Sequence, residues 1–179
     1  MTANTRVTPW SAPVRREDVP ESGLHVDLVA DAAVRAAVAA VAGLRELPRL
    51  EAHFDVARQG AGLRVAGEVS ATVGQNCVVT LEPLTTELRE PIDLVFVPAR
   101  AKPNDADRED AAIDPEAGDE PELLIDGTAD LGVAATEFLL LGIDPYPRKA
   151  GAEFEAPAAD DSAAHPFAAL AALKASPKK

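Results

Sequence analysis

The residue types that could support catalysis are a single cysteine and two histidines on neighbouring predicted strands. Cys77 could act as a thiol nucleophile if an imidazole lay close enough to take its proton. His25 and His53 could approach it across a sheet, but nothing in their spacing requires that contact. Cys77 also occupies a strand position where a small buried apolar side chain fits. We therefore predict no enzymatic activity and keep a Cys77-dependent hydrolase only as an alternative.

Other familiar sites have no signature in the sequence. The three histidines lack the His-x-x-x-His spacing of a metal site. The Gly60-Ala61-Gly62 turn lacks the lysine and the following helix of a phosphate-binding loop. Aromatic residues make up 4% of the chain, too few for an RNA surface built on base stacking. We expect no catalytic residue, no cofactor and no metal.

The charge of the chain favours a basic partner over bare nucleic acid. Acidic residues outnumber basic ones by 30 to 17, and the formal net charge is −13. Sequence-independent nucleic-acid binders neutralise phosphates with Lys and Arg, so this excess of acid argues against one, whereas a ribosomal protein would be attracted. Acidity that serves only solubility is the simpler explanation. Direct RNA binding through a local basic patch stays open, with candidates Arg45, Arg49, Arg58, Arg64, Arg148 and Lys149.

Cysteine content and hydropathy predict a cytoplasmic protein. One cysteine cannot form an internal disulfide, so nothing indicates secretion. Residues 1–6 lack the apolar run of a signal peptide, and the longest apolar stretches are too short to span a bilayer. We expect no membrane contact.

The predicted core is a sheet centred on residues 62–97. Residues 50–56 alternate between apolar and polar, and the turn at 58–62 would join them to the central strand as a hairpin. Residues 50–97 thus predict an antiparallel meander broken at Pro83 and Pro91, and residues 23–30 predict a further strand. In the central stretch, alternate apolar residues indicate one buried face, with the pattern resuming after a break at 74–76: Leu63, Val65, Val69, Ala71 and Val73, then Cys77, Val79 and Leu81.

Two helices are predicted to cover this sheet. Residues 32–42 are rich in Ala and Val, and they lie between an N-cap candidate, Asp31, and a helix-ending Gly43. Residues 131–142 follow a second N-cap candidate, Asp130, and end near Gly142. The apolar stripes are Val34, Val38 and Val41 on the first helix and Leu131, Ala134, Ala135, Phe138 and Leu139 on the second. The fold class is α+β: an antiparallel β-meander, which could curl into a partial barrel, covered by two helices.

The remaining segments predict appendages to one domain at 23–149. Residues 1–22 predict an extended segment, where Val7, Trp10 and Val14 could pack onto the body. Residues 99–121 are acidic and poor in large apolar groups, which predicts a disordered insert. Residues 150–179 predict a flexible linker and a short amphipathic helix. That helix could dock on the body or in a partner's groove, and both alternatives stay open.

Three stretches, taken in order, resemble a known family. They are GQNCVVTLEP at 74–83, IDGTADLG at 125–132 leading through the apolar helix to DPYPR at 144–148, and HPFAALAALK at 165–174. Together they resemble the YceD-like family of bacteria and plastids, in its alphaproteobacterial type, from about Leu24 to Lys174. Members of this family are also called large ribosomal RNA subunit accumulation proteins.

The resemblance implies a non-enzymatic role in the accumulation of 23S ribosomal RNA and in biogenesis of the large ribosomal subunit. Family genes commonly neighbour that of the ribosomal protein bL32. The resemblance therefore implies bL32, another ribosomal protein or a pre-50S particle as the partner, with any contact to 23S rRNA indirect. Many relatives carry a second cysteine in a Cys-x-Arg-Cys-Leu arrangement, which this chain lacks after Cys77. If those relatives bind a metal through paired cysteines, this protein cannot do so in the same way.

We expect the functional contacts on the parts that the sheet displays rather than on the sheet itself. These are the acidic insert, the exit of the second helix and the C-terminal helix. The candidate interaction residues are Tyr146, Arg148, Lys149, Phe167, Leu170 and Leu173.

Overall fold

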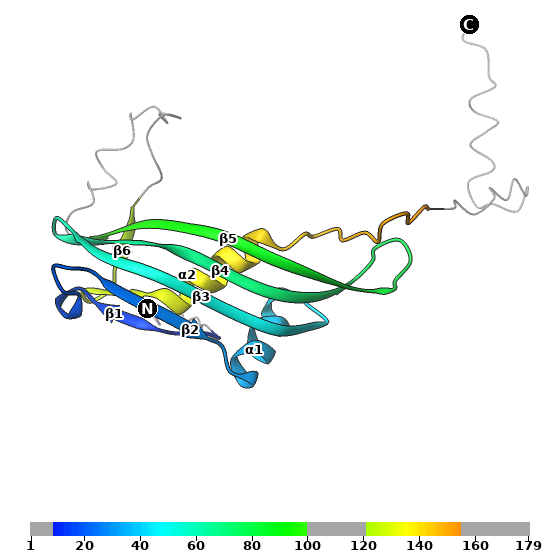
Figure 1. Cartoon of the computed structure of the whole chain (residues 1–179), viewed down its shortest axis with the longest axis horizontal. Coiled ribbons are helices and arrows are strands. Elements are labelled where there is room, and N and C mark those ends of the chain that lie inside the picture. Colours follow the sequence, from blue (N-terminus) through cyan, green and yellow to red (C-terminus); the bar gives the residue numbers. More distant parts are fainter. Residues whose placement is uncertain (1–8, 100–120, 155–179) are drawn as a thin grey trace, which may run out of the picture.

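The body of the protein is one long, twisted, open sheet with both helices on one side (Figure 1). The computed structural model describes residues 9–99 and 121–154. The strand order is β2-β3-β4-β5-β6, in which β6 adds to β5 in parallel and the other pairs are antiparallel. The strands are β2 (Leu24–Val29), β3 (Glu46–Gln59), β4 (Gly62–Asn76), β5 (Pro83–Pro98) and β6 (Glu122–Leu124).

A second, two-stranded sheet joins the N-terminal segment to the start of the second helix. It pairs β1 (Pro13–Arg15) with β7 (Thr128–Asp130), and a short 3-10 turn, η1 (Arg16–Asp18), follows β1. Trp10, just before β1, is only 6% exposed. The predicted packing of Trp10 onto the body is therefore confirmed, while Val7 lies outside the described residues.

The main sheet is buried on one face only, as the alternation of apolar and polar residues predicts. The inner-face residues of the central strands are buried, and their neighbours in sequence face solvent. Cross-strand register places the apolar residues of three strands on this one face. The buried residues are Leu50, Ala52, Phe54 and Val56 on β3, Leu63, Val65, Val69, Ala71 and Val73 on β4, and Leu88, Ile92 and Phe96 on β5. The α+β class is confirmed, and within the described residues the sheet forms no closed barrel.

Helix α1 (Ala32–Ala42) begins and ends as predicted. The Asp31 carboxylate accepts a hydrogen bond from the Val34 amide at 2.8 Å, and Gly43 adopts the left-handed φ of 64° that ends the helix. Val38 is fully buried against the body, but Val41 is 63% exposed. Its predicted place in the apolar stripe is wrong, because α1 packs on β3 near one end of the sheet and presents only a narrow face to it (Figure 1).

Helix α2 (Leu131–Gly142) lies across the inner face on β4 and β5 (Figure 1). Asp130 caps it, since one carboxylate oxygen accepts from the amides of Gly132 and Val133 at 3.0 and 3.2 Å. The same carboxylate accepts hydrogen bonds from the Ser11 hydroxyl and the Ala12 amide. One side chain therefore starts the helix and fastens the N-terminal segment to it. The predicted stripe faces inward, with Leu131, Ala135 and Leu139 fully buried.

Two predicted interruptions of the sheet are wrong. Strand β4 runs unbroken through Gly74 to Asn76, and the chain turns after it instead of continuing as a strand, so that Leu81 takes a left-handed φ of 61°. Strand β5 passes through Pro91. Within the described residues, β5 has no strand partner on its outer side at that position, so a proline there removes no bond of the sheet.

The tight turns follow the sequence closely. Gln59 pairs with Gly62 across a two-residue turn in which Gly60 has a φ of 56°. Asp126 and Gly127 both have positive φ, at 52° and 74°, the geometry of a type I′ hairpin turn. The predicted turn at 58–62 is confirmed.

Part of the predicted organisation lies outside the described residues. This holds for nearly all of the acidic insert at 99–121 and for the C-terminal segment beyond Phe154. The predicted disorder of the insert, the C-terminal helix and the domain limits therefore stay predictions. Among the residues that the structure describes, no helix combines the length and the apolar character needed to cross a membrane.

The contact between α2 and the N-terminal segment predicts an unusual response to a glycine substitution. A Cβ at Gly132 would lie 2.9 Å from backbone atoms of Trp10 and Ser11, whereas one at Gly142 would meet only the side chain of Glu90. Replacing glycine by alanine in a helix normally stabilises it by up to about 1 kcal/mol. We expect Gly132→Ala to lower the free energy of unfolding by about 1–3 kcal/mol instead, because the backbone at 10–11 must move.

Urea unfolding of the two variants provides the measurement and its control. Gly142→Ala, in the same helix, should be neutral or stabilising because the Glu90 side chain can move aside. Equal effects of the two substitutions would contradict the packing described for Trp10.

Candidate functional site

Cys77 lies where the chain turns out of β4, and it is fully buried. Its sulfur accepts hydrogen bonds from the backbone amides of Lys149 and Thr80, each at 3.4 Å. The Lys149 amide and then the Thr80 hydroxyl and amide lower the pKa of the thiol to about 6, against its burial, which would raise it. The thiol is thus buried, and the amide donors around it favour its thiolate form.

A segment far along the chain crosses the turn at 77–82, and we call residues 144–149 the strap. Its backbone is fixed at two points, since the Gln75 side chain donates to the Asp144 carbonyl at 2.8 Å and the Val78 amide to the Pro147 carbonyl at 2.9 Å. The Lys149 ammonium also donates to the Glu82 carboxylate at 2.8 Å. The sequence gives no sign of this contact, because the two segments are about 70 residues apart and neither carries a pairing pattern.

The structure separates Cys77 from the two histidines proposed to activate it. His53 pairs in register with Glu68, so about 30 Å of strand lies between it and Cys77 at 3.3 Å per residue. His25 is exposed on β2, where its hydrogen bond to Asp55 at 2.8 Å and the nearby Asp27 raise its pKa. A nucleophile needs its base within hydrogen-bond reach. Neither histidine meets that requirement, so the hydrolase alternative loses its geometric basis.

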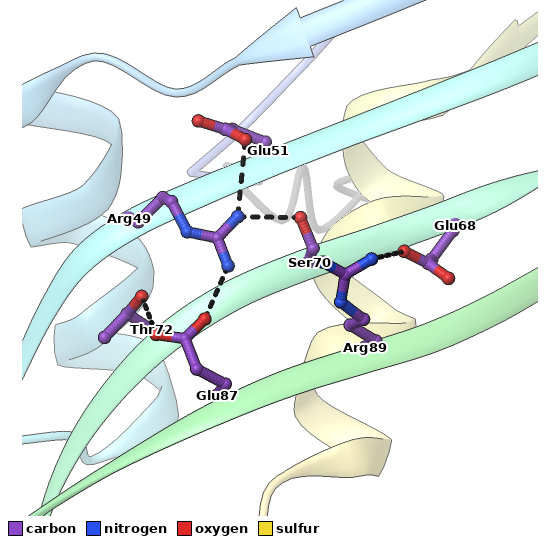
Figure 2. A network of polar contacts seen from close by, with 7 residues as sticks. All are labelled: Arg49, Glu51, Glu68, Ser70, Thr72, Glu87 and Arg89. Atoms are coloured by element: carbon purple, nitrogen blue, oxygen red, sulfur yellow. Dashed lines mark hydrogen bonds and ion pairs between the residues drawn. The ribbon is translucent and has the colours of Figure 1, made fainter.

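Four of the six basic candidates for RNA binding are paired with acids, Arg45, Arg49, Arg64 and Lys149. Figure 2 shows Arg49 on the outer face of the sheet, donating to Glu87 at 2.7 Å, to Ser70 at 2.8 Å and to Glu51 at 3.3 Å. The bond to Glu87 is the main cause of its raised pKa. The Thr72 hydroxyl donates to the other Glu87 oxygen at 2.6 Å and is the main cause of the lowered pKa of that carboxyl.

Most of the other candidates are engaged in the same way. The Arg64 guanidinium donates two hydrogen bonds to the Asp93 carboxylate, of 2.9 and 2.7 Å, in the strong bidentate geometry. Arg64 and Lys149 lie at opposite ends of β4, about 40 Å apart at 3.3 Å per residue. The remaining contacts are Arg45 to Glu46, Lys149 to Glu82, and Arg58 to the carbonyls of Val19 and Glu17. The six candidates therefore do not form one patch. Arg58 and Arg64 lie at one end of β4, whereas the other four lie near residues 72–78 at its other end: Arg45, Arg49, Arg148 and Lys149.

The strap carries the described part of the predicted interaction residues. Tyr146 is 70% exposed, and Arg148 is exposed with no carboxylate partner among the described residues. Lys149 is held by Glu82. The other three, Phe167, Leu170 and Leu173, lie outside the described residues. The structure brings the first three onto one segment and leaves their role as a prediction.

A feature that sequence reasoning missed is an apolar groove of about 850 Å³ between β5, β6 and α2, which we call the α2–β5 groove. In the sequence, only Leu141 hints at this groove, because it lies outside the predicted apolar stripe of α2. Its side chain is 80% exposed. The apolar walls include Ile92, Leu94 and Phe96 of β5, Leu123 of β6, and Val133, Phe138 and Leu141 of α2. No set of three His, Cys, Asp or Glu side chains in the described ranges is placed to hold a metal.

The titration of Cys77 predicts a stability that depends on pH. The folded pKa of about 6 lies below the ordinary value of 9.0, so folding favours the thiolate. This contribution is fully present above pH 9 and is lost as the pH falls to about 6. We expect the difference in unfolding free energy between the wild type and Cys77→Ala to grow from pH 6 to pH 9, measured by urea unfolding. The packing lost in the variant does not depend on pH, so a constant difference would contradict the amide-bound thiolate.

Comparison with known proteins assigns the chain to a family. The family model described as large ribosomal RNA subunit accumulation protein YceD matches residues 65–174. No curated protein and no solved structure gives a match. The matched range begins in β4, includes α2 and the strap, and ends at Lys174, so it contains the turn of Cys77 and the segment that covers it. The description supports a role in accumulation of large-subunit ribosomal RNA, and because the match covers more than half of the sequence, the chain belongs to the YceD family.

Proposed function

We propose that this protein is a non-enzymatic cytoplasmic factor for 23S rRNA accumulation and large-subunit biogenesis, acting through contacts with a basic ribosomal protein or a pre-50S particle. The family description supports the accumulation role. The observation that carries the choice of protein contacts over RNA contacts is the pairing of basic side chains on the sheet, above all Arg49 with Glu87 and Arg64 with Asp93.

The charge balance of the outer face supports the same choice. Exposed ion pairs are weak, about 0–1 kcal/mol each, so a phosphate could displace a single carboxylate. The displaced carboxylates would remain beside the phosphate and repel it. On this face the acids outnumber the arginines: Asp27, Glu51, Asp55, Glu68, Glu87 and Asp93 against Arg49, Arg64 and Arg89. A basic protein surface would meet attraction at the same positions.

The proposed contact residues lie on the strap and in the C-terminal segment. Tyr146 offers an exposed aromatic ring beside Arg148, two residue types that are enriched in protein interfaces. Phe167, Leu170 and Leu173 would add apolar anchors. The ribosomal protein bL32 is the first partner to test, and contact with 23S rRNA would be indirect.

Deletion of the gene tests the proposed role. We expect the ratio of 23S to 16S rRNA to fall and the wild-type gene to restore it. A Tyr146→Ala, Arg148→Ala double variant should restore it only in part, because it loses the proposed contacts without touching the core. Val29→Ala is the control, since Val29 is similarly exposed but lies on β2. An unchanged ratio after deletion would contradict the proposal.

Filter binding to 23S rRNA fragments separates protein contacts from direct RNA contacts. We expect little retention and no steep dependence on salt. The positive control is a triple variant that removes the charge of three paired acids, Glu82→Gln, Glu87→Gln and Asp93→Asn. It leaves Arg49, Arg64 and Lys149 without these carboxylates, so salt-sensitive retention of RNA should rise. If the wild type itself were retained, with a log–log salt slope of about −4 or steeper, several phosphate contacts would be present and the direct RNA-binding alternative would replace the proposal.

A further inference from the structure

The α2–β5 groove follows the open edge of β5. Its lining takes residues from both faces of this strand, Ile92 and Leu94 from the inner face and Pro91 and Asp93 from the outer. Strand β6 pairs with β5 only at Phe96–Pro98, so the edge at 91–95 has no strand partner within the described residues. A sheet edge of this kind can accept an additional strand.

The groove is also apolar in a place where the fold leaves large side chains uncovered. Leu141 is 80% exposed, Ile125 is 76% exposed and Leu123 is 38% exposed. Covering such surface contributes roughly 25 cal/mol per Å² of buried apolar area. The volume of about 850 Å³ lies within the range of roughly 300–1,000 Å³ that is typical of ligand sites. A segment with large apolar side chains would therefore gain binding energy there.

The described lining of the groove is acidic. Its charged residues are Asp93, Glu122, Asp130 and Glu137, and no Lys, Arg or His of the described ranges lines it. Asp130 caps helix α2 and Asp93 is hydrogen-bonded to Arg64, while Glu122 is exposed at the rim. A ligand with Lys or Arg would be attracted to this rim, and RNA phosphates would be repelled. A second copy of the chain, with a net charge of −13, would be repelled as well.

We propose that the α2–β5 groove binds an extended segment of a basic protein, in which large apolar side chains alternate with Lys or Arg. The segment adds to the edge of β5 beside residues 91–95, where main-chain hydrogen bonds hold it. Its apolar side chains enter the groove, and its cations face the acidic rim. The inference rests on the proposed function, because ribosomal proteins are the basic partners proposed there.

Fluorescence anisotropy with the full-length protein tests the groove directly. The probe is a short fluorescein-labelled peptide in which lysine alternates with leucine and phenylalanine. Two comparison peptides replace either every lysine by glutamate or every apolar residue by serine. We expect the basic apolar peptide to bind and the other two to bind at least about tenfold more weakly. Equal binding of all three peptides would overturn the proposal.

Two pairs of variants locate the binding. Leu141→Asp and Glu122→Lys should each weaken binding of the basic apolar peptide about tenfold. Leu81→Asp and Glu153→Lys are the matched controls, because Leu81 is similarly exposed at 76% and Glu153 is an exposed acid outside the groove. Circular dichroism checks that each variant is folded. A loss of binding in the controls equal to that in the groove variants would place the peptide elsewhere and overturn the proposal.

Other occupants give different results. If Leu170→Asp tightened binding of the peptide about tenfold, the C-terminal segment of this chain would occupy the groove. If the wild type were a dimer in light scattering and Leu141→Asp a monomer, the groove would be a self-interface. Either result overturns the proposal.

The outcome in cells separates this inference from the function on which it rests. An unchanged rRNA ratio after gene deletion removes the proposed function, whereas the peptide measurement still decides whether the groove binds. Failure of the peptide to bind, with a lowered ratio after deletion, removes only the groove.

Discussion

The fold depends on covering the inner face of a sheet whose central strand is much longer than the helix packed on it. β4 has 15 residues and spans about 50 Å, while α2 has 12 residues and spans about 18 Å. Other segments cover the rest of the apolar face. They are α1 at one end of the sheet (Figure 1), Trp10 at the start of α2, and the strap over Cys77. The α2–β5 groove remains where none of these segments reaches.

The outer face of the sheet is exposed to solvent and carries polar and charged side chains. Its cross-strand positions carry charges of both signs, and each arginine there is paired with at least one carboxylate, as Figure 2 shows for Arg49 and Arg89. These pairs add little stability individually. They place a carboxylate beside each of these guanidinium groups, so the outer face carries paired charges while the inner face is apolar.

The features that sequence reasoning recovered are those decided by neighbours along the chain. Asp31 and Asp130 cap helices because their carboxylates reach amides two or three residues on, and Gly60 and Gly127 make turns because they tolerate positive φ. The failures depend on distant neighbours. Pro91 is tolerated because β5 has no further strand partner there among the described residues, and Val41 is exposed because α1 lies at the end of the sheet. The burial of Cys77 was predicted, but the crossing of its turn by residues 144–149 was not, and neither was the groove beside the short strand β6, because no local pattern reports either contact.

One consequence follows from the position of Trp10. It is the only tryptophan in the chain, and it lies 6% exposed against the first turn of α2, held there through the Asp130 carboxylate. Its fluorescence therefore comes from one place, the junction between the N-terminal segment and the helix that covers the sheet. A red shift of that emission would report the release of this segment, so the molecule carries its own optical probe for the opening of its core.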